Sequence, residues 1–264
     1  MRYLRLFLLH FEFLAEHRSR SLVWLLISLL NPLLLLLFWQ GAARSGNNLS
    51  SWSTNTISSY YLLMVIASAF LTAHVEEDIS KYDIQYGGLS KYLVRPFSYF
   101  WLKFFEELPF RVLQGFYGII VCIGIFLIFR NFLVVSNNLP IIALSLVVII
   151  FAYFLSFIFK MIIGLLAFWL VDIGGFYQLI EIILLIFAGY LMPLDLLPRI
   201  LTQVSYILPF SYMIYFPIVS IEGKLDPASL SRVIIVQAIW LFILVFVYKK
   251  IWKSGLKKFT ALGQ

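Results

Sequence analysis

Six long apolar runs, separated by segments that carry most of the charge, constrain this chain more than any other feature of its sequence. They extend over residues 22–43, 57–74, 108–129, 141–170, 176–193 and 233–248. A hydrocarbon core about 30 Å thick takes roughly 20 helical residues to cross. Apolar residues make up 62% of the chain and charged residues only 12%. The sequence therefore predicts an all-α integral membrane protein, with residues 1–264 forming a single transmembrane domain of six membrane-spanning helices.

The distribution of basic residues predicts the orientation of these helices. Cytoplasmic segments of membrane proteins carry an excess of Lys and Arg. If the N-terminus is cytoplasmic, most of the 20 basic residues lie on the inner side: Arg2, Arg5, Arg18, Arg20, Lys81, Lys91, Arg95, Lys103, Lys160, Lys249, Lys250, Lys253, Lys257 and Lys258. We therefore expect both termini in the cytoplasm. Basic residues beside anionic head groups account for the net charge of +7, so it indicates membrane lipid as a partner and no nucleic acid.

The residues that usually carry chemistry are sparse. Cys122 is the only cysteine, and His10, His17 and His74 lack metal-ligand spacing. The sequence contains no P-loop pattern. We expect no catalytic residues, no metal, no cofactor and no nucleotide site within this chain, which is predicted not to be an enzyme.

Residues 1–20 read as an interfacial elbow helix and not as a cleavable signal, because Glu12 and Glu16 interrupt any apolar core. Helical spacing places one apolar group on a single face: Leu4, Phe7, Leu8, Phe11 and Ala15. The helix is either a simple membrane anchor or a brace for the first span.

The segment 76–103, between the second and third spans, is predicted to form two short amphipathic helices. Glu76, Glu77 and Asp78 suit a helix start, and Gly87-Gly88 allow a turn. A second helix from Leu89 would end before Pro96. The mixed charge of this segment favours a role in docking to a soluble partner over the role of a solvated connector. We expect apolar side chains to be exposed there for that partner: Ile79, Ile84, Leu89, Tyr92 and Leu93.

Two charged residues fall within the apolar runs. Lys160 is predicted to lie near the inner interface and extend to lipid head groups, in preference to a role in an ion pathway. Glu181 would be costly as a free carboxylate at its depth, so it is either functional or hydrogen-bonded across the helix bundle. Residues 189–227 are too apolar for a free loop and contain five prolines. They are predicted to form short re-entrant helices in the outer leaflet.

Two phrases of the sequence resemble a known family. GGLSKYLVRPFSY, residues 87–99, is similar to the family's cytoplasmic turn, and AGYLMPLDLLP followed by LPFSYMIYFPIVSIEG, residues 188–223, is similar to its outer segment. The residues that fit its small, apolar and proline-leucine pattern are Gly189, Pro193, Leu194, Leu197 and Pro198. With the N-terminal elbow and the six spans, the chain resembles the type-2 membrane domains of ATP-binding cassette (ABC) transporters, in particular bacterial permeases that consist of this domain alone.

The resemblance implies a permease of the bacterial plasma membrane, driven by separate cytosolic ABC ATPase subunits and paired as a homodimer or a heterodimer. Most members export drugs, lipids, polysaccharides or other amphiphiles. The loop after the second span would then be the coupling segment, and its expected ATPase contacts are Glu76, Glu77, Asp78, Lys81, Gly88, Leu89, Lys91 and Arg95. The expected substrate pathway lies on the second and fifth spans and comprises Tyr60, Tyr61, Met64, Phe70, Phe176, Tyr177, Glu181 and Phe187.

Three alternatives belong to other classes. An ion-coupled secondary carrier would need charged groups near the midplane and often an internal repeat, and an intramembrane enzyme would need clustered acid and histidine residues. A non-transporting membrane scaffold would share the topology without nucleotide-driven movement of a solute.

Overall fold

The computed structural model describes residues 2–16, 18–44, 52–128, 133–170 and 173–259, and this part of the chain forms helices without a strand. The long helices are α2 (Arg18–Arg44), α3 (Thr54–Leu71), α5 (Tyr99–Ile128), α6 (Leu139–Leu165), α7 (Gly174–Phe187) and α10 (Pro227–Leu256). The shorter ones are α1 (Arg2–Glu16), η1 (Asp78–Gln85), α4 (Leu89–Leu93), η2 (Leu166–Phe168), η3 (Leu194–Leu196), α8 (Arg199–Ile207) and α9 (Tyr215–Ile221).

Most of the described residues of each apolar run lie in one helix. Within the described residues, four helices are long and apolar enough to cross a membrane: Thr54–Leu71, Tyr99–Leu127, Leu139–Phe168 and Pro227–Leu256. The apolar parts of the other two are shorter, Leu29–Ala42 and Gly174–Phe187. The all-α membrane class is thus confirmed, whereas the number of six spans remains a prediction.

Local sequence explains where several helices begin. The Ser53 side chain accepts a hydrogen bond from the Thr56 amide, and the Thr56 hydroxyl accepts one from the Ser53 amide, which closes a capping box at the start of α3. Pro140 and Pro227 lie in the first turns of α6 and α10, where a missing amide hydrogen is harmless.

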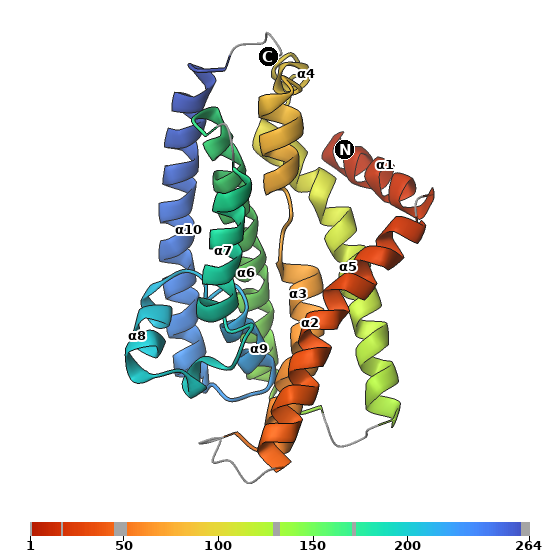
Figure 1. Cartoon of the computed structure of the whole chain (residues 1–264), viewed down its shortest axis with the longest axis vertical. Helices are drawn as coiled ribbons and strands as arrows, with labels where there is room; N and C mark the ends of the chain where they lie inside the picture. Colours follow the sequence, from red (N-terminus) through yellow and green to blue (C-terminus); the bar gives the residue numbers. More distant parts are fainter. Residues whose placement is uncertain (1, 17, 45–51, 129–132, 171–172, 260–264) are drawn as a thin grey trace.

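The helices pack as two groups around α3 (Figure 1). On one side α3 packs against α2 and α5, while on the other α6 packs against α10 and α9, and both α6 and α9 contact α3. Gln237 links the second group, because its amide donates to the Val148 and Tyr212 carbonyls, each at 3.0 Å. α7 leaves Leu179 and Ile182 exposed.

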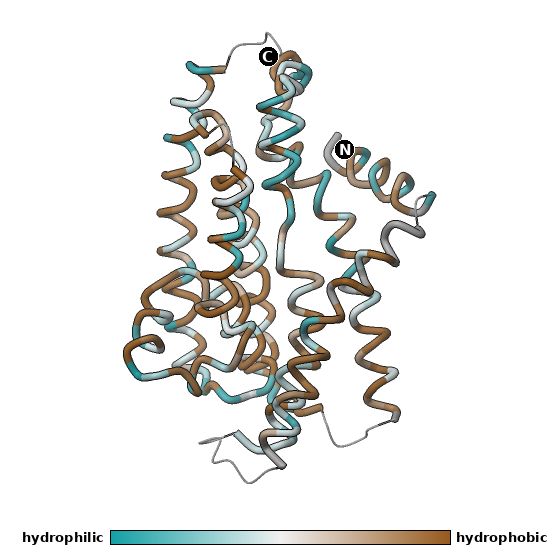
Figure 2. Tube along the Cα trace, in the orientation of Figure 1, coloured by the Kyte–Doolittle hydropathy of each residue, from teal (hydrophilic) through white to brown (hydrophobic). Residues whose placement is uncertain are grey.

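Several of the short helices lie toward the ends of the bundle. α1, α4 and the end of α10 lie at one end, and α8 and α9 lie toward the other (Figure 1). Hydrophobic residues cover most of α2, α10 and the far half of α5, whereas hydrophilic residues cluster around η1 and α4 (Figure 2). We call the end with α1, α4 and the α10 C-terminus the basic end.

α1 packs on α5. Leu6 packs on the core, and His10 and Leu14 are half-buried. The predicted apolar face is turned outward, with Leu4 and Leu8 exposed. The helix is therefore present, and its contact with the membrane surface remains a prediction.

Candidate functional site

The second apolar helix stops early, and a separate helical segment continues toward the basic end. α3 ends at Leu71, residues 72–75 are not helical, and the chain becomes helical again at Glu76, leading into η1. The break frees backbone amides, which need partners when buried. The Ala73 amide donates to the Ser156 hydroxyl at 3.2 Å, and the His74 amide donates to Glu107 at 3.0 Å. Side chains of α6 and α5 thus stabilise the break.

The predicted turn between two short helices is confirmed. Gly87 has φ +73, which favours glycine, and a Cβ on Gly88 would lie 2.5 Å from the Tyr82 carbonyl oxygen. α4 then folds back over five residues and ends before Arg95-Pro96. We call η1 and α4 together the η1–α4 pair.

A buried polar cluster attaches the η1–α4 pair to the start of α5. The Lys103 ammonium lies 2.7 Å from Asp83, which also accepts a hydrogen bond from the Tyr99 hydroxyl at 2.7 Å. Glu106 lies 3.3 Å from Lys103 and accepts from the Tyr92 hydroxyl at 3.4 Å. Buried ionic groups are stable only when they have an ionic partner and hydrogen bonds. This cluster therefore fixes the η1–α4 pair against α5.

A second cluster attaches the start of the segment to α6 and α7. The Lys160 ammonium lies 2.7 Å from Glu76 and 2.5 Å from Glu181. The Tyr177 hydroxyl donates to the Glu76 carbonyl at 2.8 Å. Burial raises the pKa of Glu76, and Lys160 opposes that rise. The expectation that Lys160 extends to head groups is wrong, because its side chain is only 3% exposed and is held inside the protein.

Close approach of backbone is needed at this second cluster. A Cβ on Gly164 of α6 would lie 2.9 Å from the Glu76 carbonyl oxygen and 2.8 Å from the Ile79 Cβ. Only a residue without a side chain lets the start of η1 lie this close to α6.

The residues expected to contact an ATPase divide into two sets. Glu76 is 8% exposed and Leu89 is 0% exposed, so both are packed inside the chain and neither offers a contact surface. Gly88 is half-buried. The exposed members are Glu77, Asp78, Lys81, Lys91 and Arg95. The expected exposure of apolar side chains in this segment is wrong for Ile79, Leu89 and Tyr92, which are buried.

The residues expected on a substrate pathway also divide. Tyr60, Tyr61 and Met64 are almost fully buried within one chain. The Tyr60 hydroxyl donates to the Gly189 carbonyl and the Tyr61 hydroxyl to the Leu191 carbonyl, each at 2.8 Å. These tyrosines therefore join α3 to the end of α7.

The other expected pathway residues are less enclosed. Phe176, Tyr177 and Phe187 of α7 are half-buried, and the Glu181 side chain is 58% exposed. Phe70 of α3 is half-buried and stacks on Tyr153. Among the eight residues, Glu181 is the one whose side chain is exposed.

Sequence reasoning missed several polar residues. One buried cluster comprises Asp83, Tyr99 and Lys103. The sequence does give one signal for it, a lysine directly after the apolar run YFWL. At the opposite end, Glu222 is buried with Lys224 3.3 Å away, and the Lys224 ammonium lies over the Trp52 ring. Burial raises the pKa of Glu222 to about 7, although Lys224 lowers it.

The sequence matches the model of a family described as ABC-2 family transporter protein, over residues 29–263. No curated protein matches the chain.

Proposed function

This chain belongs to the ABC-2 transporter family and is an ABC transporter permease, and we propose that cytosolic ATPase subunits dock on its η1–α4 pair and drive export of an amphiphilic compound. Association with an ABC ATPase subunit is implied by the family. ATP hydrolysis would take place on that partner. The basic end would lie on the cytoplasmic side of a bacterial plasma membrane, so that both termini are in the cytoplasm.

One observation carries the proposal: the η1–α4 pair has an exposed charged face and a buried ionic attachment. Glu77, Asp78 and Lys81 of the exposed set offer both signs of charge to a soluble protein. Beneath them, Asp83 binds Lys103 of α5, and Glu76 binds Lys160 of α6. A solvated connector would not need two buried ion pairs to hold it.

The attachment provides a mechanical route for ATP-driven motion. A push on the η1–α4 pair would act directly on α5 through Asp83, and on α6 and α7 through Glu76 and Lys160. The non-helical residues 72–75 separate this motion from α3. Closure of two ATPase subunits would thus tilt α5, α6 and α7 against α2 and α3 and open the pathway alternately to each side.

We place the substrate pathway along α7, in a space shared with a second permease chain, identical or related. Glu181, Phe176, Tyr177 and Phe187 would line it. Aromatic surfaces suit flat or amphiphilic molecules, and one carboxylate would favour a cation.

The test is coexpression of the tagged permease with the ABC ATPases encoded beside it, followed by purification and an ATPase assay in lipid. We expect an ATPase to copurify. The double variant Glu77→Lys/Asp78→Lys should greatly reduce its recovery, because it reverses the charge of the proposed contact. Arg199→Glu on α8, exposed toward the opposite end, is the matched control and should retain the partner.

Two results would contradict the proposal. A permease that purifies alone, with no effect of nucleotide on any solute, would favour the carrier or scaffold alternatives. Equal loss of the ATPase in the control would show that charge reversal acts on folding and not on docking.

A further inference from the structure

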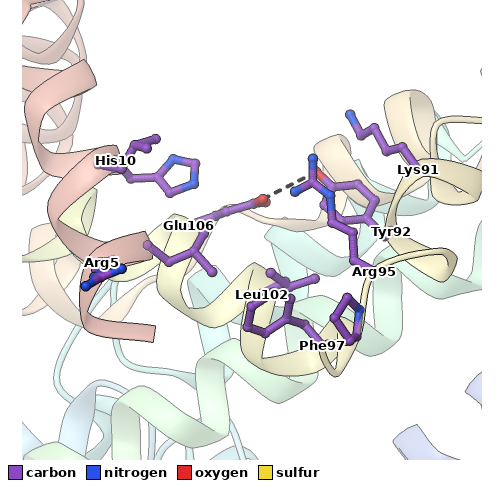
Figure 3. Close-up of a pocket in the computed structure, with 11 residues that line it drawn as sticks. Arg5, His10, Lys91, Tyr92, Arg95, Phe97, Leu102 and Glu106 are labelled. Carbon is purple, nitrogen blue, oxygen red and sulfur yellow. Dashed lines mark hydrogen bonds between the residues drawn. The ribbon is translucent and has the colours of Figure 1, made fainter. Parts of the chain in front are cut away.

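A cavity of about 900 Å³ lies at the basic end between α1, the α4–α5 connection and the first turns of α5. Figure 3 shows Arg5 and His10 on the α1 side, Lys91, Tyr92 and Arg95 on the other side, and Leu102 and Glu106 of α5 between them. Its walls come from segments far apart in the sequence, and among its lining residues only Lys91 and Arg95 belong to the exposed residues expected to contact an ATPase.

The cavity has an excess of positive charge. Arg5, Lys91 and Arg95 line it, and none of them makes an ion pair within the part of the chain that the structure describes. Its one acidic side chain, Glu106, lies 3.3 Å from Lys103, which is outside the lining and also binds Asp83. The cavity therefore presents three cations and one carboxylate.

The positions of two of these cations are fixed by an aromatic ring. The Lys91 ammonium lies 4.8 Å and the Arg95 guanidinium 5.8 Å from the centre of the Tyr92 ring. Such cation–π contacts hold the charges in place without neutralising them. Tyr92 is in turn held by Glu106 and Lys103.

Apolar residues complete the lining. Leu6 and Leu9 come from α1, and Phe97 and Leu102 come from the α5 side. Leu9 is itself 63% exposed, and Phe13, one turn further along α1 on the same face, is 52% exposed, so the apolar surface extends outside the cavity. Cations beside a continuous apolar surface match a molecule with an anionic head and hydrocarbon chains.

We propose that this cavity binds the head group of an anionic phospholipid, whose acyl chains lie along Leu9 and Phe13 on the surface of α1. The phosphate would lie among Arg5, Lys91 and Arg95, since guanidinium and ammonium groups are strong donors to phosphate oxygens. The bound lipid would join the elbow helix α1 to the η1–α4 pair. The proposal requires that the chain be embedded in a membrane and does not depend on ATP-driven transport.

The first test is native mass spectrometry of the purified full chain, equilibrated with equal amounts of phosphatidylglycerol and phosphatidylcholine. We expect selective retention of phosphatidylglycerol by the wild type. The variant Arg5→Gln/Lys91→Gln/Arg95→Gln should bind it about tenfold more weakly or worse, because each basic residue near an anionic lipid contributes to affinity. The matched control, Lys249→Gln/Lys250→Gln/Lys253→Gln, removes three exposed charges from the same end of the molecule and should retain the lipid.

If the triple variant does not fold, the single variant Arg95→Gln replaces it, and we expect an intermediate loss of phosphatidylglycerol binding. Equal retention of both lipids by the wild type, or equal losses in the two triple variants, would overturn the proposal. So would complete competition by glycerol phosphate at the lipid's own concentration, which would indicate a site for a free anion.

The second test is a photocrosslinking amino acid at His10 in the assembled transporter. A phospholipid adduct supports the proposal. An adduct with the ATPase subunit would instead show that a segment of the partner fills the cavity.

Discussion

The Lys103 ammonium of α5 lies 2.7 Å from the Asp83 carboxylate of η1, and the two side chains are only 7% and 1% exposed. An ion pair this deeply buried is weakly stabilising as a whole, but the loss of one partner leaves a charge with no solvent. Replacing only one of the two side chains should therefore weaken the attachment of the η1–α4 pair more than replacing both.

Lys103→Met is expected to destabilise the protein by about 3–5 kcal/mol, because it leaves Asp83 buried without a cation. Asp83→Asn should cost less, because Lys103 keeps its 3.3 Å contact with Glu106. The double variant should recover part of that loss. Thermal unfolding of the four proteins in detergent measures the coupling energy. Lys81→Met is the control, since the Lys81–Glu77 pair belongs to the same segment but is exposed, and little change is expected. Additive losses in the double variant would show that the two side chains do not interact.

Lys160→Met should be more damaging than Glu181→Gln. Removal of Lys160 leaves Glu76 buried without its cation, whereas removal of the exposed Glu181 carboxylate leaves the Lys160–Glu76 pair intact. Unfolding temperatures should rank wild type, Glu181→Gln and Lys160→Met in decreasing order. A transport assay on a stable Glu181→Gln protein then separates the two roles: normal transport means a structural hydrogen bond, and lost transport means a place on the pathway.

Gly164→Ala should weaken the docking of η1 on α6. The new methyl group would lie 2.9 Å from the Glu76 backbone oxygen, and a backbone atom cannot move aside as a side chain can. We expect a loss of about 1–3 kcal/mol from overpacking. Gly124→Ala, in the open on α5 with no atom within 4 Å, should be neutral or stabilising by up to about 1 kcal/mol. Identical effects of the two substitutions on unfolding temperature would refute a special contact at Gly164.

Glu222 should make stability depend on pH near neutrality. Its pKa is about 7 in the folded protein, against 4.5 for an ordinary glutamate. Between these values the folded state binds more protons than the unfolded state, so stability falls as pH rises from 4.5 to 7. Glu222→Gln should remove that decline and stabilise the protein at pH 8 by about 1–3 kcal/mol. Thermal unfolding at several pH values tests this against Glu12→Gln, an exposed carboxylate. An unchanged pH slope in Glu222→Gln would disprove it.

Much of the architecture could be predicted because its signals are local. Apolar runs of membrane-spanning length predicted the long helices, and Gly87-Gly88 with Pro96 predicted the turn and the end of α4. Each signal lies within a few residues of the feature that it determines, so no knowledge of distant contacts was needed.

The pairings could not be predicted, because they join residues far apart in the sequence. Lys160 and Glu76 are 84 positions apart, and their contact depends on how α6 packs against the break after α3. The same limit explains the error at Ile79 and Leu89. An apolar side chain in a connecting segment can be covered by a partner or by its own chain, and the sequence pattern is the same in both cases.

The position of Lys160 between its two acids also has a consequence for biosynthesis. Glu76 precedes Lys160 by 84 residues and Glu181 follows it by 21. When the ribosome delivers α6, a carboxylate that can neutralise its lysine has already been made, while the second acid is still to come. The insertion machinery therefore receives Lys160 after Glu76, its first counterion. Glu181 arrives last, on α7, and completes the group of three charged side chains.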